Sequence, residues 1–167
     1  MDDGKDDQET SDTRLRETKS LSERCELISV SDIMTQDAVT VRVDDSIDHV
    51  MEVMVTKSHH SYPVLDENNE LKGIVDQDNI LELLFFERNP RHHHTHLMAV
   101  RALSEDVRTL MIKHPITVPH DMNLCNAADL MIKHHVDRMC VVKDGKLAGI
   151  ISKEDMIKKV FELRRME

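Results

Sequence analysis

The sequence of 167 residues is 40% hydrophobic but only 2% aromatic, which fits an aliphatic core in one compact unit or two small ones. Its formal charge of −10, counted with neutral histidines, argues against nucleic acid or an anionic membrane surface as the main partner, because both attract a basic face. Three isolated cysteines, an acidic start and no apolar stretch long enough for a bilayer predict a cytoplasmic protein with reduced thiols.

The chain begins with an acidic segment. Residues 1–12 contain six acidic residues and one lysine, a composition typical of a solvated tail. We therefore expect residues 1–27 to form an acidic, flexible tail, with room for a short helix over residues 14–26.

Two similar series of elements follow the tail. Each begins with a short helical segment and an extended Thr-Val pair, and continues with a helix whose apolar residues recur at helical spacing. Two strands joined by a polar turn come next, and a final helix closes the series. In chain order the segments are Val30–Met34, Thr40-Val41, a helix around Ile47–Met54, Tyr62–Leu65, Leu71–Val75, and then Val107–Met111, Thr117-Val118, a helix around Leu124–Met131, Met139–Val142 and Leu147–Ile151.

The two series are copies of one repeat. A shift of 77 residues superposes Met34 on Met111, and after a one-residue deletion in the turn a shift of 76 superposes Gly73-Ile74 on Gly149-Ile150. One unit of this size is marginal alone, so we expect the copies to pack together through their small sheets. The sequence thus predicts an α/β (α+β) fold of two pseudo-symmetric β-α-β-β-α motifs, comprising residues 28–88 and 104–163 with a His-rich linker over 89–103.

The repeats resemble a known family. The stretches DIMTQDAVTV…SYPVLDENNELKGIVDQDNIL and TLMIKHPITV…DRMCVVKDGKLAGIISKEDMI are similar to two cystathionine β-synthase (CBS) domains in tandem, a pair often called a Bateman module. The resemblance covers roughly residues 28–163. It implies a module that usually dimerises and that binds adenosine-containing ligands, such as AMP, ADP, ATP or S-adenosylmethionine, in clefts between the repeats.

The resemblance implies a main ligand site in the second repeat. Ser152 and Asp155 match the family's hydroxyl-x-x-Asp motif, whose carboxylate accepts hydrogen bonds from ribose hydroxyls. The same pattern is a variant of the capping box, so Ser152 alternatively only caps the last helix. The family also uses the segment before the Thr-Val strand and the entry of the next strand, with two apolar side chains against the adenine faces and an arginine reaching phosphate. The predicted residues there are Ile116, Thr117, Asp137, Arg138 and Met139.

The first repeat departs from the family pattern. Asp76 replaces the hydroxyl residue and Asn79 replaces the ribose-binding aspartate. A second carboxylate at the phosphate end repels a nucleotide, and Asp76 is a good helix cap. We therefore expect a weaker, empty or specialised second site, lined by Thr40, His60, Ser61, Tyr62, Asp76 and Asn79.

The linker is rich in histidine. His92 and His96 stand four residues apart, a spacing that suits a divalent metal if the segment is helical. No acidic residue or cysteine lies close to them, so a solvated linker or a dimer contact is the more ordinary interpretation. The same histidines could make the module pH-responsive.

The sequence predicts no enzyme. It contains no nucleophile elbow, Walker-type loop or dinucleotide fingerprint, and four glycines cannot form a glycine-rich phosphate cradle. We expect a homodimeric regulatory module that binds AMP, ADP or ATP, with S-adenosylmethionine as another candidate, and that signals to a partner protein through dimer geometry. The alternatives are a metal- or pH-responsive module and a structural dimerisation module without ligand.

Overall fold

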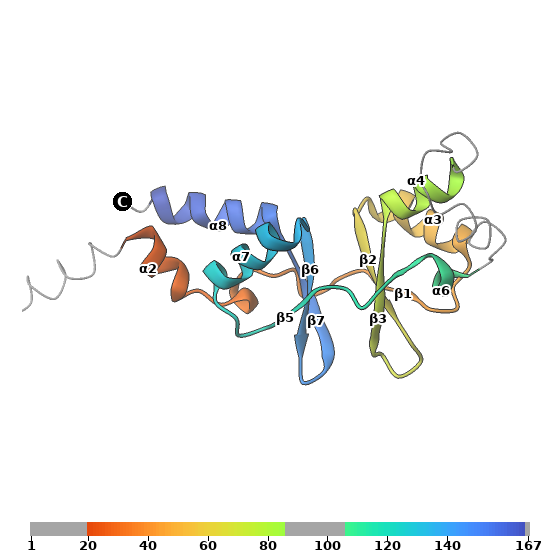
Figure 1. Ribbon diagram of the computed structural model, residues 1–167, viewed down its shortest axis with the longest axis horizontal. Helices are drawn as coiled ribbons and strands as arrows, with labels where there is room; N and C mark the ends of the chain where they lie inside the picture. The colour runs from red at the N-terminus through yellow and green to blue at the C-terminus, as the bar shows by residue number, and fades with distance from the viewer. Residues whose placement is uncertain (1–19, 86–105, 166–167) are drawn as a thin grey trace, which may run out of the picture.

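The computed structural model describes residues 20–85 and 106–165, which form two α/β repeats side by side (Figure 1). This arrangement confirms the predicted mixed α/β fold. The elements of the first half are α2 (Leu21–Glu26), η1 (Val30–Asp32), β1 (Val41–Arg42), α3 (Ile47–Lys57), β2 (Ser61–Leu65), β3 (Leu71–Asp76) and α4 (Gln77–Leu84). Those of the second half are α6 (Val107–Leu110), β4 (Ile112–Lys113), β5 (Thr117–Pro119), α7 (Leu124–His134), β6 (Arg138–Lys143), β7 (Lys146–Ser152) and α8 (Lys153–Arg165).

The central helix of each repeat begins and ends in the same way. Ser46 caps α3 and Asn123 caps α7, each through a side-chain oxygen that accepts a backbone N–H bond. Both helices end on a residue in the left-handed conformation, Ser58 at φ 53° and His135 at φ 54°. These left-handed ends turn the chain directly into the next strand, so the residues after them lie at a fixed place between the repeats.

The strands form two small sheets that face each other at the middle of the molecule, with the long helices outside (Figure 1). In each sheet the short first strand pairs in parallel with the second, which pairs in antiparallel fashion with the third. Val64 and Val141 lie at equivalent places in the two sheets, and each is fully buried in the core on the helix side of its own sheet. The sheets face each other across the middle of the molecule, as the repeat predicts (Figure 1).

The repeats exchange the segments that precede their first strands. Strand β4 of the second repeat pairs with β3 of the first, and Thr35 of the first repeat bridges to Ile150 in β7. The apolar side chains follow the same rule, since Val107 of α6 is buried in the core of the first repeat and Val30 of η1 in the core of the second. Each half of the chain therefore completes the core and the sheet edge of the other half.

The described part of the predicted tail is not a free segment. A full capping box at Ser20 starts α2, within the range where a short helix was expected, and Cys25 is buried in the core of the second repeat. Helix α2 packs against α7 and α8. The remainder of the tail (residues 1–19) and the predicted linker (residues 89–103) lie outside the described residues.

Candidate functional site

Two clefts lie between the repeats, and the internal repeat relates one to the other. We call them the α8 cleft and the α4 cleft, after the helix that begins at each. The α8 cleft has a volume of about 290 Å³ and is lined by Thr35, Asp37, Ala38, Val39, Ser58, His59, His60, Ser61, Arg138, Ile150, Ser152, Glu154 and Asp155. The α4 cleft has a volume of about 410 Å³ and is lined by His60, Ser61, Ile74, Asp76, Gln77, Asp78, Ile112, His114, Pro115, Ile116, His135, Val136, Asp137 and Arg138.

The hydroxyl-x-x-Asp motif lies in the α8 cleft and forms a closed cap. The backbone N–H and the hydroxyl of Ser152 both donate to Oδ2 of Asp155, at 2.9 and 2.6 Å. The backbone N–H of Asp155 returns a bond to the Ser152 hydroxyl oxygen at 3.2 Å. Oδ1 of Asp155 accepts no hydrogen bond from any residue that the structure describes, so this carboxylate oxygen is available to a ligand.

Arg138 lies at the start of β6 and lines both clefts. Its guanidinium makes no hydrogen bond or ion pair with the described residues. The neighbouring carboxylates have other partners. Lys153 donates to Asp137 at 2.8 Å and holds the pKa of that carboxyl below its ordinary value, and Lys158 does the same for Glu154 at 2.8 Å. Arg138 adds a smaller electrostatic contribution that also lowers the pKa of both carboxyl groups, but no described residue holds its guanidinium by a hydrogen bond or ion pair, so the guanidinium can approach an anion in either cleft.

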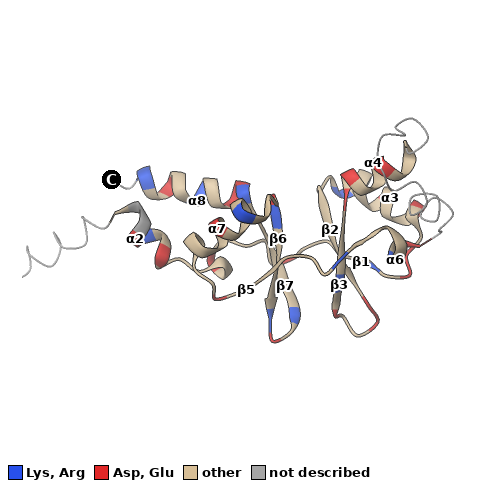
Figure 2. Ribbon diagram, in the orientation of Figure 1, with Lys and Arg blue, Asp and Glu red and all other residues tan. Residues whose placement is uncertain are grey.

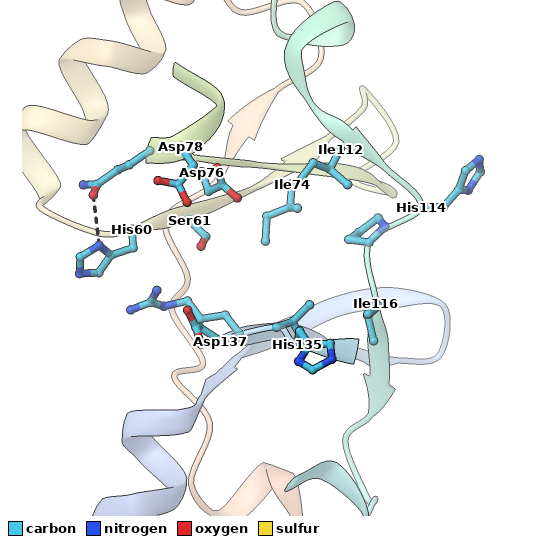
Figure 3. A pocket seen from close by; sticks show the side chains of 14 residues that line it. His60, Ser61, Ile74, Asp76, Asp78, Ile112, His114, Ile116, His135 and Asp137 are labelled. Atoms are coloured by element: carbon cyan, nitrogen blue, oxygen red, sulfur yellow. Dashed lines mark hydrogen bonds between the residues drawn. The ribbon is translucent and has the colours of Figure 1, made fainter. Parts of the chain in front are cut away.

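The α4 cleft has a different chemistry (Figure 3). Asp76 accepts the backbone N–H of Asn79 at 2.9 Å, and the Asn79 side-chain oxygen accepts the backbone N–H of Asp76 at 3.2 Å. These two residues thus form a capping box for α4, the structural role expected for Asp76. His60 Nδ1 lies 3.1 Å from the side-chain oxygen of Gln77. Asp76 and Asp78 lie on one side of the cleft and Asp137 lies on the other.

The residues predicted for the main site do not all line one cleft. Ile116 lines the α4 cleft with Asp76, whereas Ser152 and Asp155 line the α8 cleft. The segment that faces Asp155 is Thr35–Val39 of the first repeat, which was not predicted from the sequence. These residues line different clefts because the repeats exchange the segments before their first strands. The internal repeat identifies Val39 as the counterpart of Ile116, but a sequence repeat does not show that the two segments are exchanged.

Several predicted residues lie outside both clefts. Met139 and Tyr62 were expected at the ligand, but both side chains are buried in the cores, at 1% and 0% exposure. Side chains alternate along a strand, so the preceding residues, Arg138 and Ser61, face the clefts instead. Thr40, Thr117 and Asn79 are also absent from the residues that line either cleft. His60, Ser61, Asp76, Asp137 and Arg138 lie where a ligand in a cleft would meet them.

Over residues 20–85 and 106–165, no three histidine, cysteine or acidic side chains gather closely enough to hold a metal ion. His92 and His96 lie outside these ranges. Within the same ranges, no helix combines the length and the apolar character that a bilayer crossing needs.

Comparison with known proteins agrees with the fold. The sequence model of the CBS domain matches residues 30–85 and 106–162. The chloroplastic CBS domain-containing protein CBSX1 of Arabidopsis thaliana is 27% identical, over 89% of this chain and 70% of that protein. The crystal structure of CBSX2 in complex with AMP gives a TM-score of 0.70 at 28% identity, covering 82% of this chain and 98% of that chain. Inosine-5'-monophosphate dehydrogenase of Methanocaldococcus jannaschii is 26% identical over 77% of this chain, which spans only 23% of that enzyme.

Proposed function

Because the chain belongs to the CBS-domain family, we propose that it is a non-catalytic regulatory module whose α8 cleft binds an adenosine-containing ligand of the AMP, ADP or ATP class. S-adenosylmethionine is a further candidate. The observation that carries the proposal is the presence in one cleft of Asp155 Oδ1 and the Arg138 guanidinium, neither of which has a hydrogen-bond or ion-pair partner among the residues that the structure describes. The similarity to CBSX2, which was crystallised with AMP, supports the same ligand class.

The groups in the α8 cleft suit the three parts of a nucleotide. Asp155 Oδ1 would accept the hydrogen bonds of the ribose hydroxyls. Arg138, beside the start of α8, would pair with phosphate, which the N-terminal end of a helix also favours. Across the cleft, Ala38 and Val39 are half-buried and would pack on the adenine, with backbone groups of the same segment at its polar edge.

The ligand would act by joining the repeats. One wall of the α8 cleft comes from α8 and β7, and the other comes from the segment Thr35–Val39 of the first repeat. A nucleotide that contacts both walls favours the arrangement in which they are closest, which is a shift of population between conformations. A partner protein that recognises this arrangement would respond to the concentration of the ligand, and thus to adenylate energy state if AMP and ATP compete.

The first test removes the ribose contact without removing the cap. The structure of the first repeat shows that an asparagine in this position still forms the capping box, so Asp155→Asn keeps the start of α8 folded. At a hundred times its Kd a ligand raises the free energy of unfolding by about 2.7 kcal/mol, an increase of several degrees in Tm. We expect AMP, ADP, ATP or S-adenosylmethionine to give this increase for the wild type and a much smaller one for Asp155→Asn.

The matched control is Asp129→Asn, which removes an exposed carboxylate on α7 away from both clefts. This variant should keep the full increase in Tm. If none of the four ligands stabilises the wild type, the proposal is contradicted, and the Ser152–Asp155 pair only caps the helix.

We also propose that a second copy of the chain covers the outer helices. Large apolar side chains are exposed at equivalent positions of the two repeats, including Phe85 directly after α4, at 51% exposure, and Phe161 in α8, at 60%. Leu81 and Ile157, one helical turn earlier, are a second equivalent pair and are also exposed. Apolar surface of this kind on a monomer is typical of an interface, and matching patches on two pseudo-symmetric halves suit an isologous dimer.

The dimer is tested by Phe161→Glu, which places a charge in the middle of the apolar surface of α8. Burying this charge in an interface without a partner is strongly unfavourable, so the variant should sediment as a monomer at concentrations where the wild type is a dimer. Phe161→Leu keeps the apolar character and should remain a dimer. A wild type that is monomeric at all concentrations would contradict the proposal.

A further inference from the structure

The two clefts share one cation. Among the described residues that line them, Arg138 is the only lysine or arginine, and it lines both. Its counterpart in the first repeat is Ser61, which also lies between the clefts but carries no charge. Two pseudo-symmetric sites therefore have a single arginine between them. One guanidinium cannot form close ion pairs with phosphates in both clefts without bringing two anions together.

The formal charge of the first residues of α8 and α4 indicates in which cleft Arg138 can pair with a phosphate. Three carboxylates line each cleft, Asp37, Glu154 and Asp155 in the α8 cleft and Asp76, Asp78 and Asp137 in the α4 cleft. The helices that begin there differ in charge. Over the seven residues that begin with Ser152, Lys153 and Lys158, which lie beside the α8 cleft without lining it, offset Glu154 and Asp155, so the formal charge is zero. The seven equivalent residues that begin with Asp76 contain Asp76, Asp78 and Glu82 and no lysine or arginine, so the charge is −3. Figure 2 shows this difference as blue beside red at the start of α8 and red at the start of α4.

The α4 cleft nevertheless has room and apolar surface for a nucleoside. It is the larger of the two clefts, and Ile74, Ile112 and Ile116 line it (Figure 3). What it lacks is a site for phosphate, because the carboxylate of Asp76 lies at the position that the hydroxyl of Ser152 has in the other cleft. Asp78 corresponds to Glu154, which is also a carboxylate but is paired with Lys158 at 2.8 Å. Neither Asp76 nor Asp78 forms an ion pair with a described residue.

From these observations we infer that Arg138 determines the ligand charge that each cleft accepts: one phosphorylated ligand binds per chain, in the α8 cleft, and the α4 cleft takes only an adenosine without net negative charge. This inference rests on the proposed function, since it assigns ligand classes to the clefts between the repeats. It predicts that the clefts are not two equal nucleotide sites.

Isothermal titration calorimetry on the full chain tests this inference with AMP and adenosine as probes. The wild type should bind one AMP per chain, and protein saturated with AMP should still bind adenosine. Arg138→Met keeps the length of the side chain and removes its charge. It should weaken AMP binding about tenfold to hundredfold, the loss expected for a charged hydrogen-bonded contact, and should leave adenosine binding nearly unchanged. The control is Arg164→Met, which removes an exposed arginine near the far end of α8 and should bind AMP like the wild type.

A gain of function provides the second test. Ser61→Arg combined with Asp76→Ser supplies the missing arginine and removes one repelling carboxylate, and this variant should bind two AMP molecules per chain. The inference is overturned if the wild type binds two AMP molecules with equal affinity, if adenosine cannot enter the AMP-saturated protein, or if Arg138→Met weakens AMP and adenosine equally. Failure of both AMP and adenosine to bind at all would instead contradict the proposed function itself.

Discussion

Replacing Met139 with alanine should lower the free energy of unfolding by about 2–5 kcal/mol, the usual cost of truncating a buried methionine. Its side chain is 1% exposed and belongs to the core of the second repeat, which also contains Met131 and Ile151. The truncation removes buried apolar surface and leaves a cavity that the surrounding strands and helices can close only in part. Urea unfolding without ligand measures this effect as a lower midpoint.

The same experiment distinguishes a core residue from a ligand contact. If Met139 covered a face of the adenine, alanine would mainly weaken nucleotide binding and leave the stability of the free protein within about 0.5 kcal/mol. Leu27→Ala is the matched control, because Leu27 is 68% exposed and its truncation removes little buried surface. Equal unfolding midpoints for Met139→Ala and the wild type would contradict the placement of this side chain in the core.

Replacing Gly149 with alanine should be similarly damaging, for the opposite reason. A Cβ atom at this position would collide with the backbone carbonyl oxygen of Thr35 and lie 3.1 Å from the sulfur of Met34. Thr35 is held there by two backbone hydrogen bonds with Ile150, at 2.9 and 3.0 Å, so it cannot move without breaking them. Overpacking of this kind costs about 1–3 kcal/mol, and each lost backbone bond adds about 1 kcal/mol.

Gly149→Ala should also weaken ligand binding in the α8 cleft. Thr35 begins the segment that forms one wall of the α8 cleft, so a displaced bridge should weaken AMP binding as well as lower the urea midpoint. Gly145→Asn is the control: this glycine has φ +76°, a Cβ atom added to it would meet nothing within 4 Å, and asparagine tolerates the left-handed region. Unchanged stability of Gly149→Ala would mean that the two repeats do not approach as closely as the structure shows.

Much of this fold was predictable because the chain contains it twice. The repeat placed the two strands and the helices of each motif, and the confirmed fold class followed from the short polar turns and helical spacing. The contacts between copies were not predictable in the same way. Superposing Val39 on Ile116 establishes that the two residues are equivalent in the repeat. It does not show whether each segment packs against its own repeat or against the other one.

The site was only partly predictable for the same reason. Ser152 and Asp155 were correctly expected to lie together, because their spacing brings them to one helix start. The wall opposite them depends on a tertiary contact between distant segments. Met139 is a different case, because strand alternation could have placed it. Arg138 precedes it and is polar, so a strand that exposes Arg138 to a cleft must turn Met139 toward the core.

The reciprocal exchange of segments allows the two clefts of one chain to differ in sequence. Two separate polypeptides of one motif each would make these contacts by trading the segment before the first strand, which is the geometry of a domain-swapped dimer. The present chain is equivalent to such a dimer with its two subunits joined end to end. Identical subunits must keep identical clefts, whereas a joined pair can change one half alone. The serine at 152 and the aspartate at 76 form a difference that two identical subunits could not have.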